Sequence, residues 1–318
     1  MFNASDIESP SDLRQLLYQR SQSFRNVLPF GPAPNPNLKW LYTSALQKAI
    51  HRGHSEIAAM CAASLSAIDP GYCWRRLPII ALEDVGFGNK IACALVLEAA
   101  KSAAFRRKLG ERQVLFFLLD ELCTSVKDRS LCDLAVLNHN RPPPAKLWRQ
   151  YIDNLNLPFI DSYLAKNGRS ASNLGVQVPL LIEEMPDDVS IVESPPDTYG
   201  DEIIANLPAC AYDQHTREGK RAYAYFAKAC RPVREYFDQN PELNPVKSIG
   251  IIMFLIESAI LDRHLHWQGR SALLCRSQRR DCVVYGMTIE QAKQLQSIAQ
   301  ENRADLNEAR RTIASRDT

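Results

Sequence analysis

The sequence predicts an all-α protein, because two features of its apolar pattern agree. Apolar residues recur at spacings of three and four over most of the chain from residue 38 onward, which is the period of an amphipathic helix. No alternation typical of a strand competes with that pattern between residues 38 and 140. The composition, with 46% hydrophobic and 23% charged residues, is typical of a globular protein, and 318 residues suffice for one large or two modest cores.

Residues 1–37 are expected to form a proline-rich N-terminal arm. Pro32, Pro34 and Pro36 each lack a backbone N–H group and fix φ, so a continuous helix cannot pass through them. Ahead of these prolines, residues 11–25 are predicted to form one short helix.

Residues 38–140 are predicted to form a compact antiparallel helical array. The apolar spacing predicts helices at 41–50, 57–68, 72–82, 91–104, 111–126 and 131–137. We expect Ser55 to cap the second of these helices and the turn at Gly86 to end the third.

Residues 141–202 form a variable region in which the helical pattern weakens. Prolines 142–144 interrupt the array, and a helix is predicted only at 144–154. The segment 183–202 is rich in acidic residues and proline, so we expect an extended linker or an exposed loop there.

Residues 203–287 are expected to form a second helical part. The spacing predicts helices at 203–212, 220–230, 233–240 and 246–266, followed by a basic connector at 269–287.

Residues 288–318 are predicted to form one long C-terminal amphipathic helix. Thr288 and Gln291 match a capping box at its start. Alanines and Asn302 weaken the apolar seam that follows, so the helix either docks on its own domain or pairs with another chain.

Charge and motif content narrow the classes of function. The 38 basic and 36 acidic residues leave a formal net charge of +2, so a nucleic-acid surface would have to come from clustering. No segment matches the phosphate loop G-x-x-x-x-G-K-[ST] or the G-x-S-x-G elbow, so we expect no nucleotide cofactor, no catalytic residues and no enzymatic activity.

The cysteines and histidines point neither to a disulfide framework nor to a metal site. The nine cysteines contain no C-x-x-C pair, and the set His264, His266, Cys275 and Cys282 has no standard zinc spacing. With no signal-peptide pattern and no apolar run of transmembrane length, the sequence favours a cytoplasmic protein with reduced thiols and no membrane span.

Two short motifs carry most of the remaining information. The first runs L-Q-K-A-I-H-R-G over residues 46–53 and contains Lys48 and Arg52, which share a helix face at i, i+4. The second runs W-R-R-L-P-I-I-A-L-E-D-V-G over residues 74–86. Its Arg75 and Arg76 either pair internally with Glu83 and Asp84 or join Lys48 and Arg52 in a phosphate-binding patch.

A third motif, Y-D-Q-H-T-R-E-G-K-R, covers residues 212–221. Thr216 is expected to cap the following helix, and Asp213 to accept backbone N–H groups. Lys220 and Arg221 add basic charge beside aromatic residues that either face the core or contact single-stranded nucleic acid.

The motifs resemble the C-terminal helical collar of the replication-associated recombination protein A family, which belongs to the clamp-loader superfamily. Trp74, Glu83, Asp84 and Gly86 belong to the better-matched part, at about residues 40–135, and Asp213 and Thr216 to the looser match at 203–268. The resemblance implies an all-helical, oligomerising collar without its ATPase module. It therefore implies a protein that self-associates as a homo-oligomer or binds a replication or repair protein, with DNA contact through the basic residues Lys48, Arg52, Arg75 and Arg76.

Two further hypotheses remain open at this point. One is a sequence-independent DNA-binding module whose affinity depends on Arg75 and Arg76. The other is a hydrolase or nuclease with an unfamiliar site built from Asp213, His215, Glu83 and Asp84.

Overall fold

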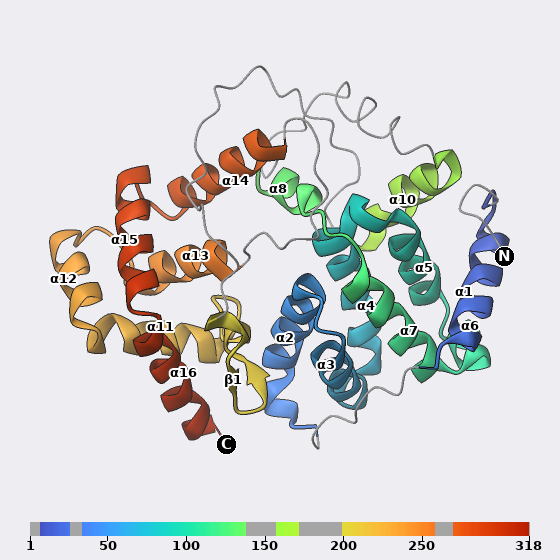
Figure 1. Cartoon of the computed structure of the whole chain (residues 1–318), viewed down its shortest axis with the longest axis horizontal. Helices are drawn as coiled ribbons and strands as arrows, with labels where there is room; N and C mark the ends of the chain where they lie inside the picture. Colours follow the sequence, from blue (N-terminus) through green and yellow to red (C-terminus); the bar gives the residue numbers. More distant parts are fainter. Residues whose placement is uncertain (1–6, 26–33, 138–156, 172–198, 258–269, 318) are drawn as a thin grey trace. The chain divides into compact units, whose positions relative to one another are not determined.

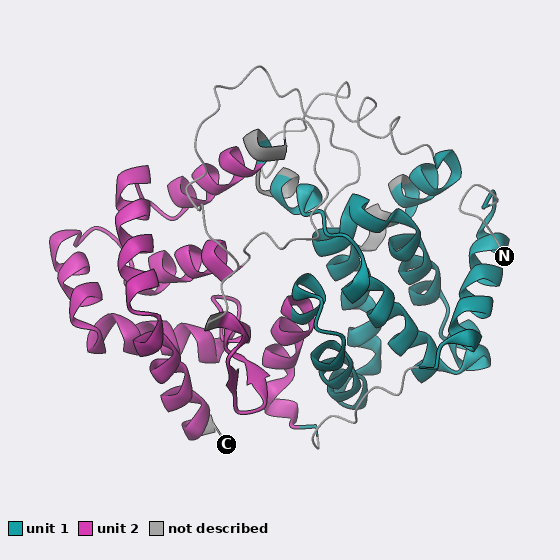
Figure 2. Ribbon diagram, in the orientation of Figure 1, with its two compact units in different colours: residues 1–34, 49–186, 262–273 teal, residues 35–48, 187–261, 274–318 magenta. Residues whose placement is uncertain are grey.

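The computed structural model describes residues 7–25, 34–137, 157–171, 199–257 and 270–317 (Figure 1). Within these residues the chain is helical apart from one hairpin of two-residue strands, which confirms the predicted all-α class. The chain divides into two compact units (Figure 2). Unit 1 contains residues 1–34, 49–186 and 262–273, and unit 2 contains residues 35–48, 187–261 and 274–318.

Unit 1 is built around helix α5 (Lys90–Lys101), whose side chains are buried along most of its length. Around it pack α1 (Pro10–Ser23), α4 (Pro70–Ile80), α7 (Glu111–Thr124) and α10 (Pro158–Ala171). The unit also contains α3 (Ser55–Ile68), α6 (Ala103–Leu109) and α8 (Ser130–Leu137). Between α4 and α5 the chain forms a π-helical turn, η3 (Ala81–Val85), and a short 3-10 turn, η4 (Gly86–Asn89).

Side-chain caps explain where the unit 1 helices begin. Ser9, Asp69, Asn89 and Ser102 accept backbone N–H groups at the starts of α1, α4, α5 and α6. The prediction for Ser55 was wrong: it is the first helical residue of α3, and His54 precedes it without a side-chain cap bond.

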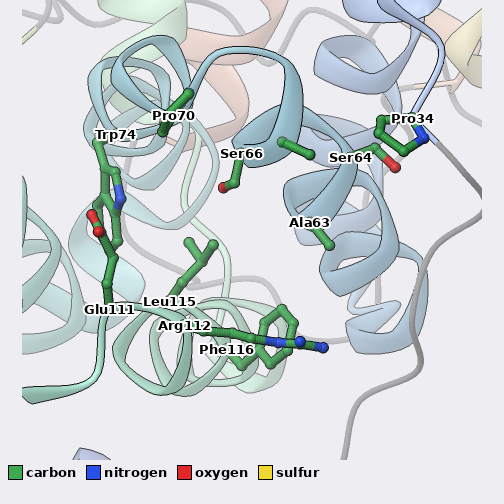
Figure 3. A pocket seen from close by; sticks show the side chains of 11 residues that line it. Pro34, Ala63, Ser64, Ser66, Pro70, Trp74, Glu111, Arg112, Leu115 and Phe116 are labelled. Atoms are coloured by element: carbon green, nitrogen blue, oxygen red, sulfur yellow. The ribbon is translucent and has the colours of Figure 1, made fainter. Parts of the chain in front are cut away.

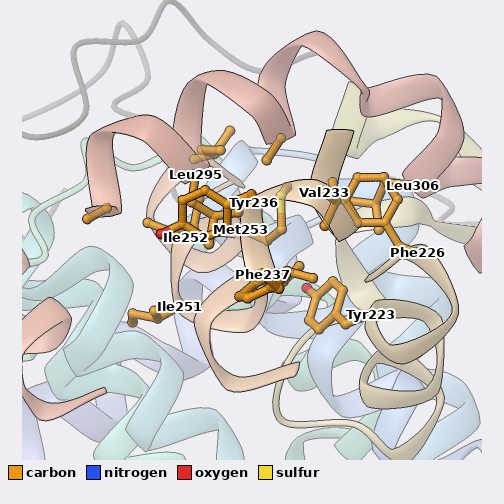
Figure 4. Close-up of a cluster of buried hydrophobic side chains, with 14 of the residues drawn as sticks. Tyr223, Phe226, Val233, Tyr236, Phe237, Ile251, Ile252, Met253, Leu295 and Leu306 are labelled. Carbon is orange, nitrogen blue, oxygen red and sulfur yellow. The ribbon is translucent and has the colours of Figure 1, made fainter. Parts of the chain in front are cut away.

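Unit 2 contains one large apolar core (Figure 4). The core joins α11 (Arg217–Ala229), α12 (Arg231–Gln239), α13 (Pro245–Glu257), α15 (Ile289–Glu301) and α16 (Arg303–Asp317). Tyr223 and Phe226 of α11 enter it with Ile252 of α13, Leu295 of α15 and Leu306 of α16. The described part of unit 2 also contains three 3-10 turns: η2 (Pro36–Leu38), η5 (Tyr199–Asp201) and η6 (Ala209–Ala211).

The helix predicted at 203–212 is instead a small hairpin. Strand β1 (Ile203–Ile204) pairs antiparallel with β2 (Leu207–Pro208), and the two linking residues, Ala205 and Asn206, have φ values of 49° and 65°. Two positive φ angles make a tight turn that suits a hairpin, and proline interrupts a helix by removing a donor. The helix was predicted because the spacing of the apolar residues also fits a helix, and the turn and the proline were given no weight.

The C-terminal region also differs from the prediction. The segment predicted as a basic connector is mostly helix α14 (Arg270–Val284), which ends just before Gly286 with its φ of +81°. The single long helix predicted at 288–318 is two helices, because Asn302 breaks it between α15 and α16. The predicted capping box of Thr288 and Gln291 is confirmed, and the apolar seam is buried within unit 2.

Helix α2 (Lys39–Arg52) supplies residues to both units, because the division falls between residues 48 and 49. The predicted segment 38–140 is therefore shared between units. Most of the predicted segment 141–202, including the acidic stretch up to residue 198, lies outside the described residues, as does the end of the predicted helix 246–266.

All nine cysteines are among the described residues, and all are free thiols. Eight are buried and Cys132 is half-buried. Burial raises the pKa of the Cys93 and Cys123 thiols to about 12 and that of Cys73 to about 11.

Candidate nucleic-acid interface

A basic groove with an aromatic wall lies on unit 2. It encloses about 620 Å³ and is lined by Trp40, His215, Arg217, Lys220, Arg221, Ala224 and Val246. The lining residues come from the first turn of α2, the loop before α11, one face of α11 and the first turn of α13. Only two of these seven residues, Lys220 and Arg221, were predicted as binding residues.

Helix α11 places its cations in the groove because of its spacing. Arg217, Lys220, Arg221 and Ala224 follow i, i+3, i+4, i+7, so they share one helix face. Tyr223 and Phe226 are buried on the other side, so the apolar core fixes which face is basic.

Two cations of this face, Arg217 and Lys220, are accessible to a ligand. Arg217 pairs with buried Glu218 at 3.0 Å, yet 68% of its side chain is exposed. Lys220 is exposed, and no carboxylate in the described part of the chain pairs with it. The positive end of the helix macrodipole lies at the same end of α11, which further favours an anion.

The loop from Tyr212 to Thr216 fixes the start of α11. Thr216 accepts the backbone N–H of Gly219 at 3.0 Å, and Asp213 accepts the N–H of His215 at 2.8 Å, so both predicted roles are confirmed. The backbone of the loop passes so close to Gly219 that a Cβ there would lie 2.0 Å from the Asp213 carbonyl oxygen. His215 is exposed at the edge of the groove.

Trp40 gives the groove its aromatic wall. Its indole is 56% exposed, which is unusual for so large an apolar side chain. The helical phase explains this exposure, because Leu41, Ala45 and Ala49 face the interior of the protein and Trp40 lies outside their row. The ammonium of Lys39 lies 5.8 Å from the Trp40 ring.

Lys48 cannot belong to a surface patch of this kind, although the sequence placed it in one. It is only 7% exposed, and its ammonium lies 3.6 Å from a carboxylate oxygen of Asp213 and 5.0 Å from the centre of the Phe254 ring. Ser44 donates to the same Asp213 oxygen at 3.1 Å. Lys48 and Asp213 are thus a buried pair that holds the part of α2 up to Lys48 within unit 2.

The other predicted basic residues belong to unit 1. Arg52 is half-buried at the end of α2, and Arg75 is exposed on α4. Arg76 pairs with Glu83 at 3.7 Å, which confirms the internal ion pair as one of its roles. Trp74 is buried at 4% exposure, beneath the guanidinium of Arg106 at 4.2 Å from its ring centre.

Asp84 is the centre of a buried polar cluster in unit 1. One of its carboxylate oxygens lies 3.4 Å from Nδ1 of His51 and 3.5 Å from Nε of Arg129. Arg129 also reaches the sulfur of Cys132 at 3.5 Å. Burial lowers the pKa of His51, although Asp84 acts in the opposite direction, and burial raises the pKa of the Cys132 thiol to about 12.

Gly86 follows this cluster and adopts a φ of +48°, as a turn at this position requires. A Cβ there would lie 2.6 Å from the carbonyl oxygen of Asp128, so only glycine fits. The second motif therefore ends in a close approach between η4 and the segment before α8.

A second hollow of about 490 Å³ lies in unit 1 between α3, α4 and α7 (Figure 3). Small residues of α3 such as Ala63 and Ser66 face Trp74, Leu115 and Phe116 across it. Its charges are already engaged, since Glu111 accepts from Arg106 at 2.8 Å and Arg112 lies over the Phe116 ring at 5.0 Å. This hollow offers a mainly apolar surface.

The four residues of the hydrolase hypothesis do not share one unit. Asp213 and His215 belong to unit 2, whereas Glu83 and Asp84 belong to unit 1. Each of these three carboxylates pairs with a cation within 4 Å: Asp213 with Lys48, Glu83 with Arg76, and Asp84 with Arg129. Among the described residues there is no group of three or more His, Cys, Asp or Glu side chains arranged to hold a metal ion; His264 and His266 lie outside them.

Comparison with protein-family models finds no match, and no curated protein and no solved structure matches the chain either. Of the helices that the structure describes, none has the length and apolar character needed to cross a bilayer.

Proposed function

We propose that this chain is a non-enzymatic accessory protein of DNA replication or recombination that binds single-stranded DNA in the groove of unit 2. The exposed indole of Trp40 carries the proposal, because it lines the same groove as Arg217, Lys220 and Arg221. Stacking platforms combined with basic side chains are how proteins bind single strands without reading their sequence.

Each component of the groove has a separate part in this proposal. The cations of α11 neutralise backbone phosphates, which gives affinity and salt dependence. The indole of Trp40 stacks on a base, which favours an unpaired strand over a duplex whose bases are already stacked. Val246 and Ala224 provide apolar surface between these polar elements.

The replication or recombination context rests on the resemblance of the motifs to a clamp-loader collar. In this proposal the helical units form such a collar, and the chain self-associates and binds a replication or repair protein. We expect size exclusion with light scattering to give a defined oligomer; a monomer at all concentrations would contradict the self-association part.

The DNA-binding part is tested by fluorescence anisotropy of a labelled oligo(dT) strand over a series of salt concentrations. Replacing Arg217, Lys220 and Arg221 together by alanine should weaken binding and reduce the slope of log affinity against log salt by about 2, at about 0.7 per phosphate contact. Lys293→Ala is the matched control, since it removes an exposed lysine of α15 that does not line the groove.

Stacking is tested separately through Trp40. Trp40→Ala should weaken binding about 5- to 150-fold, equivalent to about 1–3 kcal/mol, without changing the salt slope, whereas Trp40→Phe should retain most of the affinity. If the parent protein, Trp40→Ala and Trp40→Phe all bind with equal affinity, the groove is not the binding site. A duplex that competes as well as the single strand would favour a general DNA-binding module instead.

A further inference from the structure

A pocket on unit 1 has a different chemical character from the groove of unit 2. It encloses about 540 Å³ between α4 and α5 and also contacts α10 through Asn167. Ile79 and Leu97 contribute to its apolar lining, and Arg75, Arg76 and Lys101 supply its charges. A volume of this size accommodates one or two large side chains.

Residues of α4 and α5 form the apolar part of the pocket. Ile79 is half-buried and so can contact a ligand, whereas Leu97 is only 4% exposed and contributes little accessible surface. Pro78 and Ala100 extend this surface without adding a polar group.

Positive charge exceeds negative charge around this apolar surface. Arg75 is exposed, and Lys101 has 40% of its side chain exposed. Glu98, which pairs with Lys101 at 3.1 Å, also pairs with Arg14 at 2.7 Å, so its single negative charge is divided between two cations. Arg76 pairs with Glu83 at 3.7 Å.

The pocket lacks the open aromatic face that a nucleic-acid base requires. Trp74 is in its wall but is only 4% exposed and has a guanidinium over its ring, and Tyr72 is half-buried. Aliphatic surface surrounded by cations is instead complementary to apolar side chains flanked by carboxylates.

We propose that this pocket binds a short acidic segment of a partner protein, in which one or two large apolar side chains are flanked by Asp or Glu. The apolar side chains contact Ile79 and Ala100, and the flanking carboxylates pair with Arg75 and Lys101. This inference does not depend on the DNA-binding proposal, because the two sites belong to different units and can be mutated separately.

The test uses the full chain and a fluorescein-labelled peptide, Glu-Asp-Leu-Phe-Asp-Glu, followed by anisotropy. Two matched peptides separate the two kinds of contact: one replaces Leu-Phe by Ser-Ser, and the other replaces all acids by their amides. We expect each replacement to weaken binding at least tenfold. We expect a similar loss from Arg75→Glu and from Ile79→Ser in the protein.

Arg107→Glu is the control for Arg75→Glu, since it reverses an exposed arginine of α6 that does not line the pocket. Circular dichroism of each variant establishes that a loss of binding is not a loss of folding. The proposal is overturned if the Ser-Ser peptide binds as tightly as the original, or if Arg75→Glu and Arg107→Glu have equal effects. It is also overturned if oligo(dT) displaces the peptide and Arg75→Glu weakens both ligands equally, since that outcome makes the pocket a nucleic-acid site.

Discussion

The Nδ1 atom of His51 lies 3.4 Å from a carboxylate oxygen of Asp84, and this contact joins the motif at residues 46–53 to the motif at residues 74–86. Both side chains are only 3% exposed. His51 and Asp84 therefore serve an internal structural purpose, because they connect the end of α2 to the π-helical turn that follows α4. Arg129 supplies a cation to the same carboxylate.

The burial of His51 predicts a specific dependence of stability on pH. Its folded-state pKa is lowered below the ordinary value of 6.5, so the unfolded chain binds a proton more readily than the folded one. This contribution is present above pH 6.5 and is lost as the pH falls toward the lowered pKa. The midpoint of urea denaturation should therefore fall more steeply below about pH 6.5 in the parent protein than in His51→Gln. Parallel curves for the two proteins would show that His51 does not titrate in this way.

A second prediction concerns the buried charges of unit 2. Glu257 is 1% exposed and accepts from Arg303 at 3.1 Å and from Arg310 at 2.8 Å. Burial alone would raise the pKa of Glu257, but Arg310 and Arg303 lower it to about 2. Glu257→Gln leaves two buried guanidinium groups without their counter-charge, so it should reduce the free energy of unfolding by about 3–5 kcal/mol at neutral pH.

The control for this change is Glu308→Gln, which removes a surface carboxylate paired with Arg311. Its side chain is 66% exposed, so the denaturation midpoint should barely move. Because the lowered pKa gives stability that is lost as the pH falls from 4.5 toward 2, Glu257→Gln should also weaken the pH dependence in that range. A small effect of Glu257→Gln at neutral pH would mean that water reaches these arginines.

Gly219 should not tolerate a side chain. A Cβ would lie 2.0 Å from the carbonyl oxygen of Asp213, and backbone cannot yield as a flexible side chain can. We expect Gly219→Ala to lower the free energy of unfolding by about 1–3 kcal/mol or more and to weaken binding in the groove, because it displaces the start of α11. Gly71→Ala, where the added Cβ would lie 3.0 Å from the flexible end of Arg75 and 3.6 Å from a carboxylate oxygen of Asp69, should cost little. Thermal denaturation of both variants makes the comparison.

The hairpin turn offers a stabilising substitution. Ala205 is exposed and has a φ of 49°, a conformation that costs alanine about 1 kcal/mol and glycine almost nothing. Ala205→Gly should therefore raise the melting temperature slightly. The same change at Ala229, an exposed residue at the end of α11, should lower it, because glycine weakens a helix. Destabilisation at both positions would show that the turn does not have this backbone conformation.

The sequence predicted the elements of this fold better than their interruptions. Helix starts such as Thr216 and Thr288 were predictable because each cap is a local hydrogen bond encoded within four residues. The hairpin that begins at Ile203 was missed, because the apolar residues of this segment also match a helical spacing. The break at Asn302 was missed because an apolar seam continues on both sides of it.

Only part of the groove could be predicted from the sequence, because its residues are far apart along the chain. Lys220 and Arg221 were found from charge, but Trp40 lies some 180 residues earlier in the sequence, and no local pattern connects it to α11. Its position outside the row of Leu41 and Ala45 was the one signal available. Lys48 was assigned to the surface because sequence shows charge but not the buried carboxylate of Asp213 that accepts it.

The free thiols of this protein provide a natural set of reporters of local opening. Cys61, Cys93 and Cys123 are buried in unit 1, and Cys210, Cys230 and Cys282 in unit 2, so each can react with an alkylating reagent only when its surroundings open. Where reclosing is faster than alkylation, the rate at each thiol gives the free energy of that opening without any mutation. Mass spectrometry of the alkylated peptides would then show whether the two units open together or independently, and whether oligo(dT) slows the opening of unit 2 alone.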